Sequence, residues 1–323
     1  MAELLEVKHL KKYFPIKGGV FRHVVGHLKA VDDVSLSIMK GRTFGLVGES
    51  GCGKSTLGRA ILRLHEPTSG QVMLDGKNIT TLSEKELVTS RRDMQIIFQD
   101  PYASLSPRRT ILQTLLEPLE THGIGTPASR RARVEELLDI VSLRKNILHR
   151  YPHEFSGGQR QRIGIARALT LEPKFIVADE AVSALDVSVQ SQVLNLLAEL
   201  QRNMGISFLF ISHDLAVVQH ISDDVGVMYL GRLVETASAM DLYRSPKHPY
   251  TRALLSAIPV PDPKTKIKRI ILEGDVPSPL NPPSGCPFRT RCSEAMDKCA
   301  ESTPELADVS DGGSAHHVAC HLY

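Results

Sequence analysis

Nine residues from Gly48 to Thr56 constrain this chain more than any other stretch, with the sequence Gly-Glu-Ser-Gly-Cys-Gly-Lys-Ser-Thr. Their glycine, lysine and serine positions have the G-x-x-x-x-G-K-[ST] spacing of a phosphate-binding loop. Residues 43–47 form an apolar run that predicts a buried strand, and residues 56–64 have helical periodicity. Glycines allow the backbone to curl with its N–H groups pointing inward at a phosphate. The alternative, a chance glycine loop between a strand and a helix, is disfavoured by the complete motif in this context.

The side chains of this loop have separate expected roles. Lys54 is expected to reach the β- and γ-phosphates of a nucleotide, and the Ser55 hydroxyl is expected to ligate Mg²⁺. The nucleotide-binding residues expected in the loop are Gly48, Glu49, Ser50, Gly51, Cys52, Gly53, Lys54, Ser55 and Thr56.

Composition predicts a globular protein of the cytoplasm. The chain has 323 residues and a formal net charge of +3, which gives no global argument for binding nucleic acid or for a basic membrane anchor. No apolar run approaches the roughly 18 residues of a membrane span, and the first residues lack the layout of a signal peptide. Four of the five cysteines follow residue 285, and in a reducing compartment such a cluster points to a metal before disulfides.

Strand-like and helical segments alternate along most of the chain. The segment 15–30 has turn character, residues 83–91 have helical propensity, and residues about 100–165 are mainly helical. This alternation predicts an α/β fold with a mostly parallel sheet covered by helices on both faces. The expected strands are residues 4–8, 34–39, 43–47, 70–76, 94–99, 175–178, 206–212 and 225–230.

A change in composition after about residue 245 predicts a domain boundary, because prolines punctuate the chain from Pro246 onward. Residues 250–258 form a short helical island in this part of the chain. We expect a small, irregular, cysteine-rich extension that is stabilised by a bound metal. The expected division is a nucleotide-binding domain at 1–250, with a helical subdomain at about 100–165, and a C-terminal extension at 251–323.

Two carboxylates follow the apolar run at 175–178. Open α/β sheets place their ligands at the carboxyl ends of the strands, where Asp179 and Glu180 would lie. Asp179 is suited to hold Mg²⁺ through its water shell, and Glu180 to orient or deprotonate the water that attacks the γ-phosphate. Acidic residues at strand ends are common, so these two alone would not indicate a nucleotide site. The phosphate loop in the same chain makes that interpretation strong.

A serine and two glycines precede the helical stretch at 162–169. Ser156 suits an N-cap, and the Gly-Gly pair leaves a helix N-terminus whose N–H groups and dipole favour an anion. Here the sequence resembles the ATP-binding-cassette (ABC) ATPase family. Its signature Leu-Ser-Gly-Gly-Gln appears in this chain with Phe155 in the first place.

The resemblance covers residues 4–260 and implies roles for further positions. Gln99 matches the glutamine loop that links Mg²⁺ and the attacking water to the membrane partner. Residues 183–186 (Ser-Ala-Leu-Asp) match the loop that crosses to the opposite subunit. His213 matches the histidine that contacts the γ-phosphate. The catalytic residues implied are Glu180, His213 and Gln99, with Gln99 also a Mg²⁺ ligand beside Ser55.

Two other positions bear on the same site. Tyr13 matches the aromatic residue that stacks on adenine. Ala181 departs from the family, which commonly has proline after the catalytic glutamate; we expect a change in loop rigidity with hydrolysis retained. The resemblance implies a P-loop NTPase fold of the ABC ATPase type, in which an antiparallel β subdomain and a helical insertion accompany the mostly parallel sheet.

The resemblance also implies a head-to-tail dimer that closes on ATP and opens after hydrolysis. The signature lies far along the chain from the phosphate loop, beyond the helical insertion, so that each signature helix would cover the nucleotide of the partner. The residues expected to act across the dimer are Ser156, Gly157, Gly158, Gln159 and Asp186.

The four late cysteines do not have a standard zinc-finger spacing. They could be unligated thiols, or they could bind zinc with His316, His317 or His321 as further ligands. The runs at 246–255, 274–279 and 281–286 resemble the C-terminal extension of ATPase subunits from dipeptide and oligopeptide importers, most closely the second of two unlike subunits. That resemblance implies a four-iron, four-sulfur (4Fe–4S) cluster of structural or regulatory role on Cys286, Cys292, Cys299 and Cys320.

The implied function is ATP hydrolysis that drives uptake of short peptides at the cytoplasmic face of the inner membrane. The implied partners are a second, unlike ABC ATPase, two membrane permease subunits that dock near residues 99–105, and an extracytoplasmic solute-binding protein. Nucleic acid is not an expected partner. Alternatives are the same machine carrying nickel, glutathione or another solute, a soluble ABC ATPase acting on nucleic acid or ribosomes, and an iron–sulfur redox protein.

Overall fold

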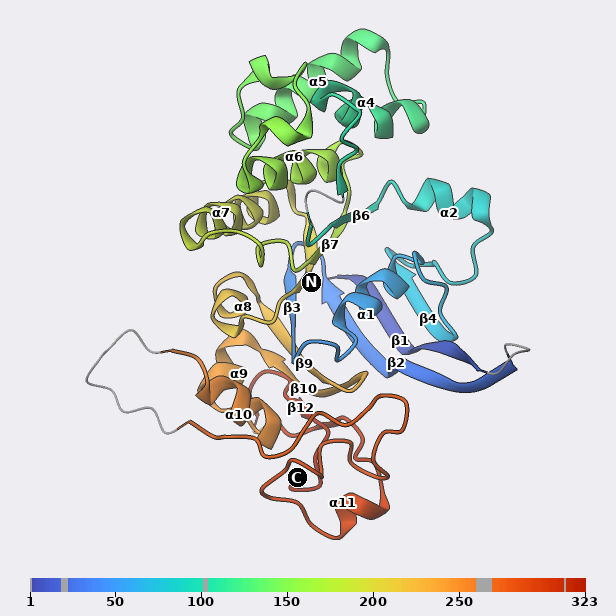
Figure 1. Ribbon diagram of the computed structural model, residues 1–323, viewed down its shortest axis with the longest axis vertical. Helices are drawn as coiled ribbons and strands as arrows, with labels where there is room; N and C mark the ends of the chain where they lie inside the picture. Colours follow the sequence, from blue (N-terminus) through green and yellow to red (C-terminus); the bar gives the residue numbers. More distant parts are fainter. Residues whose placement is uncertain (1, 19–22, 101–103, 260–268, 311) are drawn as a thin grey trace. The chain divides into compact units, whose positions relative to one another are not determined.

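The computed structural model describes residues 2–18, 23–100, 104–259, 269–310 and 312–323, and the chain forms two compact units (Figure 1). Unit 1 comprises Met1–Leu4, Met39–Arg42 and Thr81–Ile211. Unit 2 comprises Leu5–Ile38, Thr43–Thr80 and Ser212–Tyr323.

Unit 2 contains most of an antiparallel sheet with the strand order β2-β1-β4-β5. Leu5 and Val7 lie opposite Leu74 and Val72, and all four side chains are buried. Alternate residues of a strand point to the same face, so these apolar pairs set the register of β1 on β4. The strands are β1 (Glu3–Gly18), β2 (His23–Met39), β4 (Ser69–Leu74) and β5 (Lys77–Asn78).

The expected turn segment at 15–30 is wrong in its described part, because β1 continues to Gly18 and β2 already begins at His23. Val24 and Val25 are both more than half exposed. Backbone hydrogen bonds between two strands can hold a ribbon that buries no side-chain face, and such a ribbon lacks the alternation that predicts a strand. Residues 19–22 of this segment lie outside the described residues.

A second group of strands in unit 2 carries the phosphate loop. β3 (Thr43–Val47) lies parallel to β9 (Asp224–Tyr229), and all five residues of β3 are buried. β9 forms an antiparallel pair with β10 (Arg232–Ser238), which the sequence reading missed. Two short strands near the end of the chain extend this group: β12 (His317–Val318) pairs antiparallel with β10, and β11 (Ala307–Asp308) pairs antiparallel with β12.

The described residues of unit 2 include five helices, and three aromatic residues join several elements of this unit. The rings of Tyr229, Tyr250 and Phe288 are fully buried, with centroids 4.8 to 5.3 Å apart. They connect β9, α10 and the segment that carries the first late cysteines. The helices are α1 (Lys54–Ile61), α8 (Leu215–Ile221), α9 (Ala239–Arg244), α10 (Pro249–Ser256) and α11 (Lys298–Glu301).

Unit 1 contains three parallel strands and the expected helical insertion. β7 (Phe175–Asp179) lies between β6 (Met94–Ile97) and β8 (Ser207–Ile211), and β7 is buried throughout. A continuous apolar run suits a parallel strand that is covered on both faces. The helices are α2 (Glu84–Ser90), α4 (Ile111–Thr121), α5 (Pro127–Ile140), α6 (Gly157–Leu169) and α7 (Val187–Met204), with short 3₁₀ turns at Lys145–Ile147 and Pro152–Glu154.

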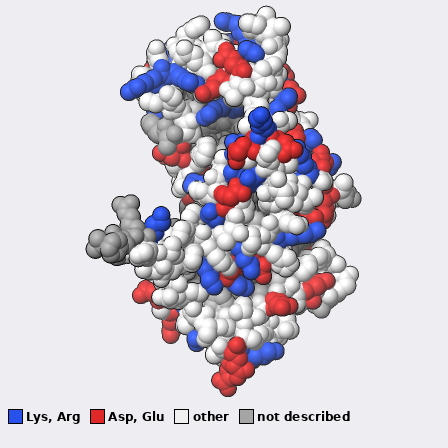
Figure 2. Space-filling model, turned by 90° about the vertical axis from the view of Figure 1, so that its right-hand side faces the viewer, with Lys and Arg blue, Asp and Glu red and all other residues white. Residues whose placement is uncertain are grey.

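Among the residues that the structure describes, none of the helices has the length and apolar character needed to cross a membrane. The face drawn in Figure 2 carries lysine and arginine side chains intermixed with aspartate and glutamate. Such mixing agrees with the small net charge of the chain.

Candidate nucleotide site

The phosphate loop lies where the sequence places it, between β3 and α1. Gly48 has φ 152° and Gly53 has φ 108°, a region that side chains at Cβ disfavour. A Cβ on Gly48 would lie 2.2 Å from the carbonyl oxygen of Met228, and one on Gly53 would lie 2.0 Å from that of Ala30. Both glycines are therefore required by conformation and by close backbone contact.

Lys54 opens α1 and is only 4% exposed. Its Nζ donates to the carbonyl oxygens of Gly48 and Glu49, at 2.7 and 2.9 Å. The ammonium is thus held on the inner side of the loop, where the two carbonyls orient it. Burial raises the pKa of the neighbouring Cys52 thiol, which keeps that group neutral.

Glu49, the second residue of the loop, has two partners that the sequence reading missed. Its carboxylate accepts two hydrogen bonds from the Arg291 guanidinium, at 2.7 and 3.1 Å. Its backbone N–H donates to the Tyr250 hydroxyl at 2.9 Å. Separations of about 200 residues or more leave no local pattern that could reveal these contacts.

Tyr13 is half-buried and its hydroxyl donates to the Asp32 carboxylate. Asp32 also accepts two hydrogen bonds from Arg232, at 2.7 and 3.0 Å, so the ring has a defined orientation. Burial and the Asp32 carboxylate raise the pKa of Tyr13, and its hydroxyl stays protonated. The Phe14 ring instead packs edge-on against His65. The contact of Tyr13 with adenine stays a prediction.

The two predicted carboxylates, Asp179 and Glu180, belong to unit 1. Asp179 ends β7 and is buried, and Glu180 follows it with φ 48°, in the left-handed region. The backbone N–H of Glu180 donates to the Ile211 carbonyl, and its own carbonyl accepts from the N–H and hydroxyl of Ser183. A non-glycine residue in this region is strained and is retained when surrounding contacts determine it, often at functional sites.

The structure brings together two predicted catalytic residues that are far apart in the sequence. The Nε2 amide of Gln99 donates to Oε2 of Glu180, at 2.8 Å. Gln99 follows β6 and Glu180 follows β7, and these strands are parallel neighbours. Their carboxyl ends therefore lie at the same edge of the sheet.

The signature residues cap α6. The Ser156 hydroxyl accepts the backbone N–H of Gln159, and the Gln159 side chain accepts the N–H of Ser156. This reciprocal pair leaves both side chains exposed at the helix N-terminus. Phe155 is buried, which explains why phenylalanine can replace leucine at that position. A Cβ on Gly158 would lie 2.3 Å from Cγ1 of Val189 on α7, so close helix packing requires glycine there.

The other predicted nucleotide residues lie on exposed turns. Asp186 is exposed directly before α7, and His213 is exposed before α8, where Asp214 caps the helix. Tyr13, the phosphate loop and His213 belong to unit 2, whereas the remaining predicted nucleotide residues belong to unit 1.

The predicted docking surface at 99–105 lies partly outside the described residues, because residues 101–103 are not described. Leu105 is buried at 2% exposure, and the Ser104 carbonyl accepts a hydrogen bond from Arg167. Leu105 thus belongs to the interior of unit 1 and presents no apolar surface to a partner.

The late cysteines are free thiols that lie near one another in unit 2. The N–H of Cys286 donates to the Cys299 carbonyl at 2.8 Å. Burial, together with the nearby Cys299, Cys320 and Cys292, raises the pKa of the Cys286 thiol to about 11. The backbone of the residue two positions later lowers the pKa at three of the cysteines, and these pairs are Cys286 with Phe288, Cys292 with Glu294, and Cys320 with Leu322.

The described residues contain no group of three or more His, Cys, Asp or Glu side chains arranged to hold one metal ion. A single zinc ion needs its sulfurs about 2.3 Å from the metal, hence close together. Two of the three histidines considered as zinc ligands have other partners. Nε2 of His316 lies 2.7 Å from the buried Glu235 carboxylate, and Nε2 of His321 lies 2.9 Å from the Ser302 carbonyl. The described residues therefore support neither the zinc alternative nor the expected 4Fe–4S cluster, and both stay predictions.

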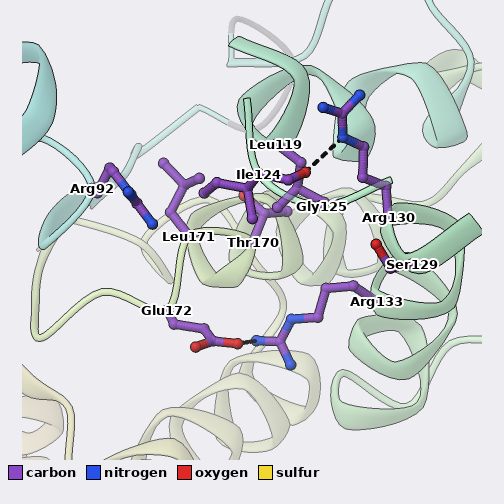
Figure 3. A pocket seen from close by; sticks show the side chains of 10 residues that line it. All are labelled: Arg92, Leu119, Ile124, Gly125, Ser129, Arg130, Arg133, Thr170, Leu171 and Glu172. Atoms are coloured by element: carbon purple, nitrogen blue, oxygen red, sulfur yellow. Dashed lines mark hydrogen bonds and ion pairs between the residues drawn. The ribbon is translucent and has the colours of Figure 1, made fainter. Parts of the chain in front are cut away.

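A separate cavity of about 250 Å³ lies in unit 1 among α4, α5 and the chain after α6. Figure 3 shows Arg130 bonded to the Ile124 carbonyl and Arg133 paired with Glu172 at this cavity. None of the predicted nucleotide-site residues lines it.

A buried strand, a glycine loop with its lysine, carboxylates after a parallel strand and a capped signature helix together define an ABC-type ATPase. The family described as ABC transporter matches residues 31–183, and the family described as oligopeptide/dipeptide transporter, C-terminal region, matches residues 234–299. The chain belongs to the ATP-binding subunits of ABC transporters, which hydrolyse ATP to drive transport.

Curated relatives match almost from end to end. The chain is 55% identical to the oligopeptide transport ATP-binding protein AppF of Bacillus subtilis, over 99% of this chain and 97% of the relative. It is 58% identical to a putative peptide import ATP-binding protein of Brucella ovis, over 98% and 97%.

Among solved structures, the cassette MJ0796 in a dimeric state bound to ADP and Pi matches with a TM-score of 0.65 and 30% identity. This match covers 73% of this chain and 99% of that one. CbiO1 of Clostridium perfringens matches with a TM-score of 0.64 and 26% identity, over 76% and 92%. The expected fold class is confirmed.

Proposed function

We propose that this chain is the ATPase subunit of an importer for dipeptides or oligopeptides. The main support for peptides as the cargo is the match of residues 234–299 to the C-terminal region of oligopeptide and dipeptide transporters. The printed names of the relatives, which specify oligopeptide transport or peptide import, point the same way.

The nucleotide site takes its roles from the positions described above. The phosphate loop binds the phosphates, with Lys54 on the β- and γ-phosphates and Ser55 on Mg²⁺. Glu180 prepares the attacking water, and Gln99 holds its carboxylate. Tyr13 stacks on adenine, Asp179 holds Mg²⁺ through water, and His213 contacts the γ-phosphate.

The active form is a head-to-tail dimer. The exposed Ser156, Gln159 and Asp186 are available to a second subunit, and MJ0796 was solved as a dimer. The partner is a similar but distinct ATPase, and the pair binds two permease subunits at the cytoplasmic face of the membrane. An extracytoplasmic binding protein delivers the peptide to the complex.

The four late cysteines hold a 4Fe–4S cluster. Their mutual proximity, through which Cys292, Cys299 and Cys320 act on the pKa of Cys286, fits cluster ligation. A cluster fills the space between its ligands, so its thiolates stand further apart than those around a single ion. When bound, it would supply iron–thiolate bonds that order a segment with few buried side chains of its own.

The cargo is tested in a complex of this chain with its partner ATPase, the two permeases and the binding protein, reconstituted in vesicles. Short peptides should stimulate ATP hydrolysis and accumulate in the direction of import. Glutathione and Ni²⁺ serve as the competing cargoes. Stimulation by either of these, without any by peptides, would overturn the peptide assignment and leave the ATPase assignment intact.

The cluster is tested by anaerobic purification of the full chain followed by iron and sulfide analysis. Wild-type protein should contain about four iron and four sulfide per chain, as the cluster's composition requires. Cys286→Ser should lose most of both, whereas Cys52→Ser should retain them because Cys52 lies in the phosphate loop. Absence of iron from the wild-type protein would refute the cluster.

A further inference from the structure

The phosphate loop of this chain contains a carboxylate where an anion must bind. Glu49 is the second residue of the loop, and its carbonyl helps to hold the Lys54 ammonium. A nucleoside triphosphate brings several negative charges to such a loop. An uncompensated glutamate there would repel it, and the effect would be strong because the site is partly shielded from water.

Arg291 neutralises this carboxylate through a geometry that is specific to arginine. Both terminal nitrogens of its guanidinium donate to Glu49, one to each carboxylate oxygen, at 2.7 and 3.1 Å. The arginine side chain is 7% exposed, so water screens the pair weakly. A planar, two-point bond of this kind fixes direction as well as charge.

A second contact holds the backbone of the same residue. The Glu49 N–H donates to the Tyr250 hydroxyl at 2.9 Å, and Tyr250 is fully buried against Tyr229 and Phe288. Arg291 is anchored nearby, since its N–H donates to the Phe288 carbonyl. The aromatic cluster therefore holds Glu49 in two ways. Tyr250 accepts from its backbone, and Arg291, anchored at Phe288, holds its side chain.

We propose that Arg291 is a positioning residue for nucleotide binding, which turns the Glu49 carboxylate away from the phosphates and cancels its charge. This role rests on the proposed assignment of Gly48–Thr56 as the phosphate loop. It gives the C-terminal extension a task in the ATPase site itself, because Arg291 directly precedes Cys292 in the extension. The extension thus supports the loop that binds ATP.

The proposal is tested by ATP affinity in a double-mutant cycle on the full chain. Arg291→Ala alone should weaken equilibrium binding of ATP about tenfold, because it leaves an unpaired carboxylate in the loop. In a Glu49→Gln background the same arginine substitution should change affinity less than about twofold, since no charge remains to be cancelled. Arg291→Lys should give an intermediate loss, because lysine keeps the charge without the two-point bond.

Two further readouts separate positioning from a structural role. The deficit of Arg291→Ala should shrink as salt is raised, because salt screens the repulsion between Glu49 and ATP. The substitution should raise the KM for ATP more than it lowers kcat, because the loss is in binding. If Arg291→Ala does not fold, Arg291→Gln is used in the same cycle.

Matched controls distinguish the possible failures. Arg289→Ala removes an arginine from the same segment, whose guanidinium bonds to Ser284 and not to the loop, and it should leave ATP affinity unchanged. Lys54→Ala tests the loop assignment itself. Equal loss from Arg291→Ala with and without Glu49→Gln, or no loss at all, overturns the positioning role. Normal ATP binding in Lys54→Ala would instead overturn the assignment on which it rests.

Discussion

The side-chain amide of Gln99 donates a hydrogen bond to the carboxylate of Glu180, with 2.8 Å between Nε2 and Oε2. The bond uses the nitrogen end of the amide, and the oxygen end is the atom suited to Mg²⁺. In the proposed assignment, one glutamine would both orient the Glu180 carboxylate and contact the metal. A movement of Gln99 would change the orientation of the Glu180 carboxylate through this hydrogen bond. The glutamine loop could in this way affect the group proposed to activate water.

Glu180→Gln should retain ATP binding and lose most ATP turnover, by about a hundredfold or more, because the amide cannot act as a base. The glutamine is nearly isosteric and keeps the strained backbone at φ 48° supported by the same contacts. Phosphate release measures turnover, and size-exclusion chromatography with ATP should reveal an accumulated dimer. Glu199→Gln, at an exposed position on α7, is the control and should hydrolyse ATP normally. Unchanged turnover in Glu180→Gln would remove Glu180 from its assigned role.

Lys54→Ala should weaken ATP affinity by about tenfold or more, because a charge-assisted bond to the phosphates is lost. The buried ammonium also bonds the carbonyls of Gly48 and Glu49, so the thermal midpoint should fall modestly. Binding of a fluorescent nucleotide measures the affinity. Lys85→Ala removes an exposed lysine of α2 and should bind normally. Equal affinities of the two variants would contradict the role of Lys54.

Gly158→Ala should destabilise the protein by about 1–3 kcal/mol, because the new Cβ would meet Val189 at 2.3 Å. Gly164→Ala lies in the same helix with nothing within 4 Å of the added Cβ, and it should stabilise by up to about 1 kcal/mol. Thermal unfolding compares the two variants. Val189→Ala combined with Gly158→Ala should recover part of the loss. A stabilising Gly158→Ala would show that α6 and α7 do not pack this closely.

His248 should make the free energy of unfolding depend on pH. Burial lowers its pKa from 6.5 to about 4, with the Glu235 carboxylate acting in the opposite direction. Between these values the unfolded chain holds a proton that the folded chain lacks, so stability falls as pH falls, by up to about 1.4 kcal/mol per pH unit. Urea unfolding at pH 7 and pH 5 measures the effect.

His248→Asn is the comparison for this pH effect. The Nδ1 atom of His248 accepts the N–H of Tyr250 at the start of α10, and asparagine is a good N-cap that does not titrate. The variant should lose much of the stability difference between pH 7 and pH 5. The Glu235 carboxylate, whose pKa is lowered, titrates below this window. An identical difference in both proteins would place the pH sensitivity elsewhere.

The phosphate loop and its supporting elements were predictable because their signals are local. β3 was expected at 43–47 and spans Thr43–Val47, and the helix that follows begins at Lys54. The helical insertion, the strand that precedes Gln99 and the strand that ends in Asp179 also follow from short-range periodicity and composition. Local steric rules and burial patterns act over a few residues, so one sequence is sufficient to find them.

Features that depend on contacts between distant segments were seen only in the tertiary structure. β10 is defined by its pairing with β9 and β12, which the sequence did not predict. The β1–β2 ribbon is held by backbone pairing, which leaves no hydrophobic pattern in the sequence. Arg291 reaches Glu49 across 242 positions of the chain. The sequence by itself determined the ATPase class and the residues of its phosphate loop. Only the tertiary structure showed that Arg291 pairs with Glu49 of the loop. Such a contact depends on how the extension packs in the folded core, and no spacing in the sequence predicts it.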